Sequence, residues 1–147
     1  MSQHNISNIL VDLRQFDLSQ KEEITKGRFG SVHKVTIPLN HDQPIECALH
    51  ITDDGIYSIS SVKQFLFQVE CQSSLKHPAI LPIIGYSLPL FGETTYTLIS
   101  PFQPNGTVEN LYLKQSTPSV LDTKKAIIIF GIAAGMAYIH QRNIIHR

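Results

Sequence analysis

Cysteine is scarce in this chain, since Cys47 and Cys71 are the only two among 147 residues. Two cysteines are too few to cross-link a small secreted scaffold, so we expect a reducing, cytoplasmic environment. Charge of either sign is not in excess either, because 12 Lys and Arg residues balance 12 Asp and Glu residues. The sequence therefore lacks the strongly basic surface that nucleic acid or an acidic membrane attracts, and we expect neither as a partner.

Long hydrophobic runs are missing as well. The longest apolar stretch, Ala126 to Ile139, covers 14 residues, whereas a membrane-spanning helix needs about 20. The first residues, Met1 to His4, show no basic-then-apolar signal pattern. The histidines and cysteines lack the spacing of a zinc motif, so we expect no metal site. The length is sufficient for one modest domain.

The clearest local pattern surrounds two glycines. Gly27 and Gly30 are three residues apart, and the residues on both sides of them alternate between two faces. This alternation predicts a strand, a glycine turn and a second strand. Glycine lets the backbone lie close to a ligand, and the N–H groups of such a turn suit a polyphosphate. An ordinary hairpin explains the same residues, because short glycine motifs are not specific.

Periodicity predicts the other elements. The expected strands cover residues 18–26, 29–37, 45–52, 81–86 and 94–100, and the expected helices cover residues 59–76, 108–114 and 123–141. Pro38 is expected to end the second strand. Along the third strand, the alternation places Ala48 and His50 on one face. The last helix is apolar nearly all round, and Gly131 and Gly135 predict a close neighbour there.

Read in order, these motifs resemble those of the protein kinase family, and most of all those of tyrosine-kinase-like Ser/Thr kinases. The resemblance covers roughly residues 13–147. The motifs are Gly27-x-x-Gly30-x-Val32, Cys47-Ala48-Leu49-His50, Leu75-Lys76-His77-Pro78, Ile99-Ser100-Pro101-Phe102 and Ile145-His146-Arg147.

The resemblance implies an α+β fold. It consists of a five-stranded antiparallel sheet with one large helix, the kinase-like N-lobe, followed by a partial helical C-lobe. In this interpretation residues 1–12 are a leader that packs on the domain, and residues 13–104 are the N-lobe and hinge. Residues 105–147 then supply two helices and the start of the catalytic loop.

The resemblance also implies a cleft for ATP or another adenine nucleotide. Three segments supply its candidate residues: Thr25, Lys26, Gly27, Arg28, Phe29, Gly30 and Val32 from the glycine loop, Ala48 and His50 from the third strand, and Ser100, Pro101 and Gln103 from the gatekeeper and hinge positions. Thr25 stands where the family has its first glycine. Pro101 has no N–H to offer adenine, but it keeps its carbonyl, and Gln103 can supply the N–H.

Two positions depart from the family together. His50 stands where the family has the lysine that grips the α and β phosphates, and Gln68 stands where it has the glutamate that holds this lysine. An unperturbed imidazole is mostly uncharged at neutral pH. We therefore expect weak ATP binding, and a neutral hydrogen bond between His50 and Gln68 in place of the ion pair.

The chain stops at Arg147, the second residue of the family's His-Arg-Asp motif. Without the aspartate and the later Asp-Phe-Gly, no catalytic residue and no Mg²⁺ site can be assigned. One hypothesis is an inactive pseudokinase or fragment with a scaffold or regulatory role in signalling, which binds proteins through the exposed last helix. The other is an incomplete product of a gene for an active Ser/Thr kinase, which transfers the ATP γ-phosphate to protein hydroxyls.

Overall fold

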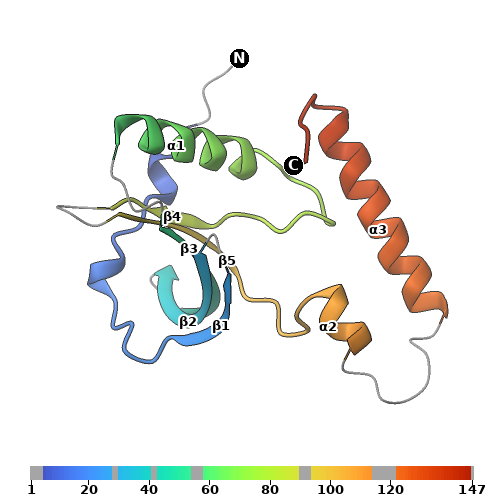
Figure 1. Ribbon diagram of the computed structural model, residues 1–147, viewed down its shortest axis with the longest axis horizontal. Helices are drawn as coiled ribbons and strands as arrows, with labels where there is room; N and C mark the ends of the chain where they lie inside the picture. The colour runs from blue at the N-terminus through green and yellow to red at the C-terminus, as the bar shows by residue number, and fades with distance from the viewer. Residues whose placement is uncertain are drawn as a thin grey trace. The chain divides into compact units, whose positions relative to one another are not determined.

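The computed structural model describes residues 5–27, 30–40, 43–53, 58–89, 94–113 and 122–146. The chain divides into two compact units. The first unit joins Met1–Ser74 to Pro82–Phe102, and the second joins Leu75–Leu81 to Gln103–Arg147. The first unit contains all five strands and the helix of residues 59–73, which are drawn in Figure 1.

The first unit is built on one antiparallel sheet with the strand order β1-β2-β3-β5-β4. Its strands are β1 (Glu22–Gly27), β2 (Gly30–Asn40), β3 (Gln43–Asp53), β4 (Gly85–Ser87) and β5 (Thr95–Pro101). The helix α1 (Ile59–Ser73) lies across one face of this sheet (Figure 1). The predicted α+β fold, with a five-stranded antiparallel sheet and one large helix, is confirmed.

A hydrophobic core lies on each face of the sheet. On one face, Cys47 and Leu49 of β3 are fully buried against residues of β2 and β5. On the other face, Phe65 and Val69 of α1 pack on Tyr86 and Tyr96. Because successive strand residues point to opposite faces, β5 contributes to both cores through Ile99 and Tyr96. On β3, Ala48 and His50 share the face that α1 covers.

The helix α1 begins and ends on serine side chains. Ser58 is its N-cap, and its Oγ accepts a hydrogen bond from the N–H of Ser61 at 3.0 Å. At the other end, the Ser74 hydroxyl donates to the carbonyl of Cys71 at 2.7 Å. A serine that bonds to a backbone carbonyl competes with the helix ladder, so α1 ends at Ser73 and the prediction of residue 76 was too long.

Three strand boundaries also differ from the predictions, and the first is that of β1, which begins at Glu22 rather than at residue 18. Pro38 does not end β2, because the strand continues to Asn40 through an irregularity in the pairing between Ile37 and Asn40. Proline is tolerated at such a break because no ladder hydrogen bond is needed there. The strand β4 begins at Gly85 rather than at residue 81. Pro82 has no N–H to donate, which is consistent with the later start.

The second unit contains α2 (Val108–Leu113) and α3 (Asp122–His140). A Cβ built on Gly135 would lie 3.3 Å from the carbonyl oxygen of Ala79, so the predicted close neighbour is present there. At Gly131 the prediction was wrong, because no described atom lies within 4 Å of a Cβ built there. Within the described ranges, no helix is long and apolar enough to cross a membrane.

One aromatic side chain joins α3 to the Leu75–Leu81 segment. The Tyr138 hydroxyl accepts a hydrogen bond from the N–H of Lys76 at 2.9 Å. The ring of Tyr138 lies 4.9 Å from that of His77, and the guanidinium of Arg142 lies 3.6 Å from the Tyr138 ring centroid. These contacts, together with Gly135, hold one side of α3 against the segment.

Apolar side chains on the remainder of α3 predict self-association. Phe130 is 75% exposed and Ile129 is 67% exposed, and an apolar surface of this kind favours association. We expect the 147-residue chain to sediment as oligomers at micromolar concentration, and the double substitution Ile129→Gln and Phe130→Gln to shift it toward monomer. The exposed Lys124→Gln on the same helix is the matched control. A parent chain that sediments as a monodisperse monomer would contradict this prediction.

Candidate functional site

The glycine turn joins β1 to β2, and Gly27 and Gly30 pair with each other at its base. Thr25, Lys26 and Gly27 lie on β1 and are exposed. Two predicted members, Arg28 and Phe29, lie outside the described residues.

The close approach of β3 leaves no room for a side chain at Gly30. The φ of Gly30, +139°, lies in the region that favours glycine, and a Cβ at this position would collide with the carbonyl oxygen of Ile51. Close packing against β3 thus requires glycine whether or not a phosphate is bound. The glycine alone does not distinguish an ordinary hairpin from a phosphate loop.

Strand register brings the other predicted residues onto one sheet face. Val32 is directly opposite His50 across β2 and β3, and Ala48 is directly opposite Ser100 across β3 and β5. Residues directly opposite each other in an antiparallel pair share a face. Val32, Ala48, His50 and Ser100 therefore form one continuous patch, in which Ala48 and Ser100 are buried.

His50 is held by Ser100 and not by the α1 helix. Its Nε2 and the Ser100 hydroxyl oxygen are 2.9 Å apart, a hydrogen bond in which either group can donate. The predicted hydrogen bond between His50 and Gln68 is wrong. Among the described side chains, no hydrogen bond joins these two residues, and Gln68 is exposed. Ser100 is the diagonal neighbour of His50 on β5, and it lies within hydrogen-bonding distance of the imidazole.

Burial sets the charge of His50. Removal of its imidazole from water disfavours the protonated form and lowers the pKa of His50 below its usual 6.5. The imidazole is therefore neutral at pH 7. The position where the resemblance implies a permanent phosphate-binding cation carries a neutral hydrogen-bonding ring.

The hinge segment is anchored to β3. Pro101 pairs with Cys47, and the N–H of Phe102 donates to the carbonyl of Glu46 at 3.0 Å. Gln103 begins the second unit, where its carbonyl accepts from the N–H of Gly106 at 3.1 Å. The Pro101 carbonyl and the Gln103 N–H, the predicted adenine partners, accordingly fall in different units.

Lys34 is a residue that the sequence prediction missed. It is opposite Ala48, so it shares the face of the patch. Its ammonium forms an ion pair with Glu46 at 2.6 Å and lies 4.7 Å from the centroid of the Phe102 ring. The period of two along β2, counted from Val32, would have placed Lys34 on this face. Because its charge is paired with Glu46, Lys34 does not replace the missing lysine at position 50.

Metal ligands do not gather near this patch. Within the described residues, no group of three or more His, Cys, Asp or Glu side chains is placed to hold a metal ion. The cysteines Cys47 and Cys71 are both free.

Comparison with known proteins identifies the fold and the family. The sequence profile described as "Protein tyrosine and serine/threonine kinase" matches residues 18–147. The probable L-type lectin-domain containing receptor kinase I.5 of Arabidopsis thaliana is 29% identical over 125 residues, which are 83% of this chain and 17% of that protein. The tyrosine-protein kinase receptor TYRO3 of Gallus gallus is 26% identical over 97% of this chain and 17% of its own length.

A solved structure agrees with this assignment. The pseudokinase drought responsive inactive kinase 1, in a co-crystal bound to ENMD-2076, superposes with a TM-score of 0.74 at 17% identity. The superposition covers 90% of this chain and 51% of that chain. At this identity the likeness shows the fold. This chain also spans less than a fifth of the length of the two curated relatives.

Proposed function

Since the chain belongs to the protein tyrosine and serine/threonine kinase family, we propose that it binds an adenine nucleotide weakly and does not transfer its phosphate. The adenine ring packs on Val32 and Ala48, with Ser100 behind it. The observation that carries this proposal is the state of His50, which is neutral at pH 7 and hydrogen-bonded to Ser100. Such a protein serves as a pseudokinase, with a scaffold or regulatory role.

Phosphates contribute little affinity in such a site. A neutral imidazole that is already bonded to Ser100 offers no charge to a diphosphate. Charge-assisted bonds to phosphate are roughly twice as strong as neutral ones. Lys34 and its partner Glu46 form a closed ion pair at the hinge end of the patch. Most of the binding free energy therefore comes from the adenine ring and not from the phosphate groups.

Restoring the lysine is the direct test. In the parent, ADP and adenosine should bind with dissociation constants within about threefold of each other. His50→Lys should tighten ADP about tenfold, which corresponds to about 1.4 kcal/mol, and leave adenosine unchanged. Isothermal titration calorimetry measures both ligands, and His50→Gln serves as the neutral control. Neither parent nor His50→Gln should label a generic protein substrate with Mg²⁺ and ATP.

Two results would count against this proposal. Phosphotransfer by the repurified parent, lost on Val32→Asp, would favour the alternative of an active Ser/Thr kinase. ADP binding far tighter than adenosine in both parent and His50→Gln would place another cation at the phosphates.

The affinity for ADP should also depend on pH. Phosphate next to His50 favours the imidazolium, so the pKa of His50 is higher in the complex than in the free protein, where burial lowers it. Affinity therefore rises as pH falls through the pKa that His50 has in the complex. Titrations of ADP at pH 7.8 and 5.8 should show a larger gain in the parent than in His50→Gln. The pH dependence of adenosine binding shows how pH affects the protein itself, because adenosine has no phosphate. The pH dependence of ADP binding to His50→Gln shows the effect of protonating the phosphate. An identical pH dependence in both proteins would remove His50 from the phosphate site.

A further inference from the structure

A small polar cavity lies between α1 and the sheet, beyond His50 along β3. Its volume is about 230 Å³, and six of the described residues line it: Thr52 of β3, Ser61, Gln64, Phe65 and Gln68 of α1, and Tyr96 of β5. The rim is exposed at Thr52, Gln64 and Gln68, whereas Tyr96 at the bottom is 1% exposed. The cavity is thus open to solvent at one end and closed by a tyrosine at the other.

The tyrosine at the closed end has an unsatisfied hydroxyl. Tyr96 Oη is buried and has no hydrogen-bond partner among the described protein groups. A buried polar atom without a partner costs about 1–3 kcal/mol, so such atoms are normally paired with protein, water or a ligand. Gln72 Oε1, one helical turn beyond Gln68, is buried and unpaired in the same way. The Tyr96 hydroxyl therefore lacks a hydrogen-bond partner, and the Gln72 side-chain carbonyl lacks a donor, among the described groups.

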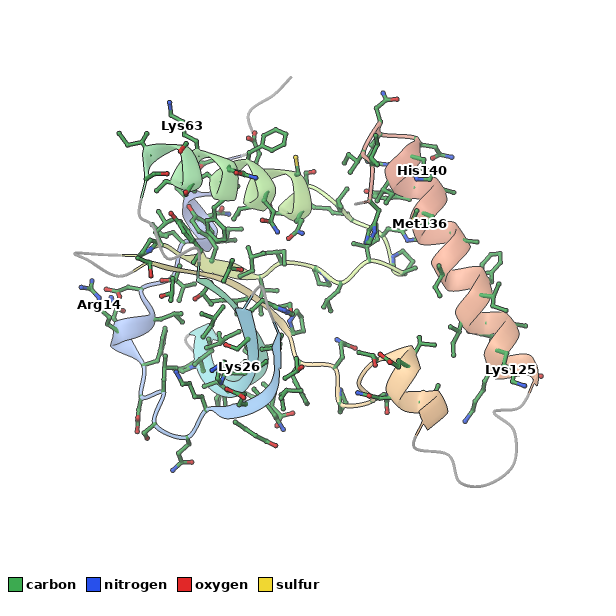
Figure 2. All side chains as sticks on the ribbon, viewed as in Figure 1. Arg14, Lys26, Lys63, Lys125, Met136 and His140 are labelled. Atoms are coloured by element: carbon green, nitrogen blue, oxygen red, sulfur yellow. The ribbon has the colours of Figure 1, made fainter. Side chains whose placement is uncertain are left out.

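Among the described residues, the lining of the cavity carries no charge. Five of the six side chains are hydroxyls or amides, and the sixth is the ring of Phe65. The only charged residues of α1 are Lys63 and Glu70, which lie about half a turn away from Ser61 and line a different surface hollow. Lys63 points away from the sheet (Figure 2). An anion or cation entering the cavity would lose hydration without meeting an opposite charge on any of these six side chains, which is unfavourable.

Size and chemistry together define the occupant. The volume is below the roughly 300 Å³ at which pockets for drug-sized ligands begin, and it corresponds to about eight waters at roughly 30 Å³ each. A mostly polar wall disfavours a hydrocarbon, and its mixed donors and acceptors suit alcohols. The Phe65 ring can contact the apolar face of a cyclic ligand while hydroxyls at the ligand's edge meet the amides.

We propose that this cavity binds a small, uncharged cyclic polyol, with the Tyr96 hydroxyl as its innermost contact. The ligand bridges α1 to β3 and β5, and so fixes the helix against the sheet. This site is separate from the adenine patch and does not depend on nucleotide binding.

The probe is myo-inositol, titrated into the 147-residue chain and followed by ligand-observed NMR. We expect saturable binding in the millimolar range. Tyr96→Phe, which removes only the hydroxyl, should weaken binding fivefold to tenfold without loss of folding. Tyr86→Phe is the matched control, because Tyr86 belongs to the same aromatic cluster but does not line the cavity, and it should bind like the parent.

Related probes separate the alternatives. An inositol monophosphate and cyclohexanol should each bind at least fivefold more weakly than myo-inositol. Tighter binding of the phosphate would make this an anion site and overturn the proposal. Non-saturable binding of myo-inositol, or equal binding by the parent and Tyr96→Phe, would show that the cavity holds only water.

Discussion

Replacing Gly30 with alanine should lower the free energy of unfolding of the first unit by about 3–5 kcal/mol. Two causes add: a φ of +139° strains any residue with a Cβ, and that Cβ would collide with the Ile51 carbonyl on β3. Small domains are stable by only about 5–15 kcal/mol, so this loss is a large fraction of the total stability. Urea denaturation followed by circular dichroism measures the loss.

Gly27→Ala is the matched control for this substitution. Among the described atoms, its Cβ would meet only the Gly30 carbonyl oxygen, at an ordinary 3.9 Å, and its φ is not in the glycine region. We expect a change below about 1 kcal/mol. Equal unfolding midpoints for the two variants would mean that the approach of β2 to β3 at Gly30 is looser than described.

Truncating Leu49 to alanine should destabilise the first unit by about 2–5 kcal/mol. Leu49 is fully buried in the core that β2, β3 and β5 share, so its removal leaves a cavity and loses apolar contacts. Ile45→Ala lies four residues earlier on the same face of β3, but Ile45 is 39% exposed. The control should therefore cost less than half as much. Similar losses from both substitutions in thermal and urea unfolding would contradict the assigned core.

Local patterns predicted the parts of this fold that depend on local chemistry. The period of two along β3 correctly separated Cys47 and Leu49 from Ala48 and His50. The long apolar helix near the end was also recognised, since α3 covers Asp122–His140. Element ends were less predictable, because they depend on tertiary context. Pro38 remains in β2 only because the pairing to β3 is irregular at that point.

The contacts of the candidate site could not be read from the sequence in the same way. The partner of His50 is fixed by the register of β3 on β5, which places Ser100 opposite Ala48. That register joins residues about fifty positions apart, and no periodicity within either strand determines it. Counting residues along the family motif pointed instead to Gln68, whose side chain is at the rim of a cavity and not at His50. Which residues bind a nucleotide stays a prediction.

The N-terminal segment has a consequence for how the chain can be shortened. β4 is the last strand of the sheet, and its outer edge is covered by a parallel bridge from Leu10 to Tyr86 and by the Val11 N–H, which donates to the Tyr86 carbonyl at 2.8 Å. An uncovered edge is a template for strands of other molecules. A version that begins at Leu13 would expose this edge and the apolar surface under Ile6 and Ile9. Expression boundaries and solubility tags therefore belong before Asn5, so that the segment stays free to pair with its own sheet rather than with a neighbour's.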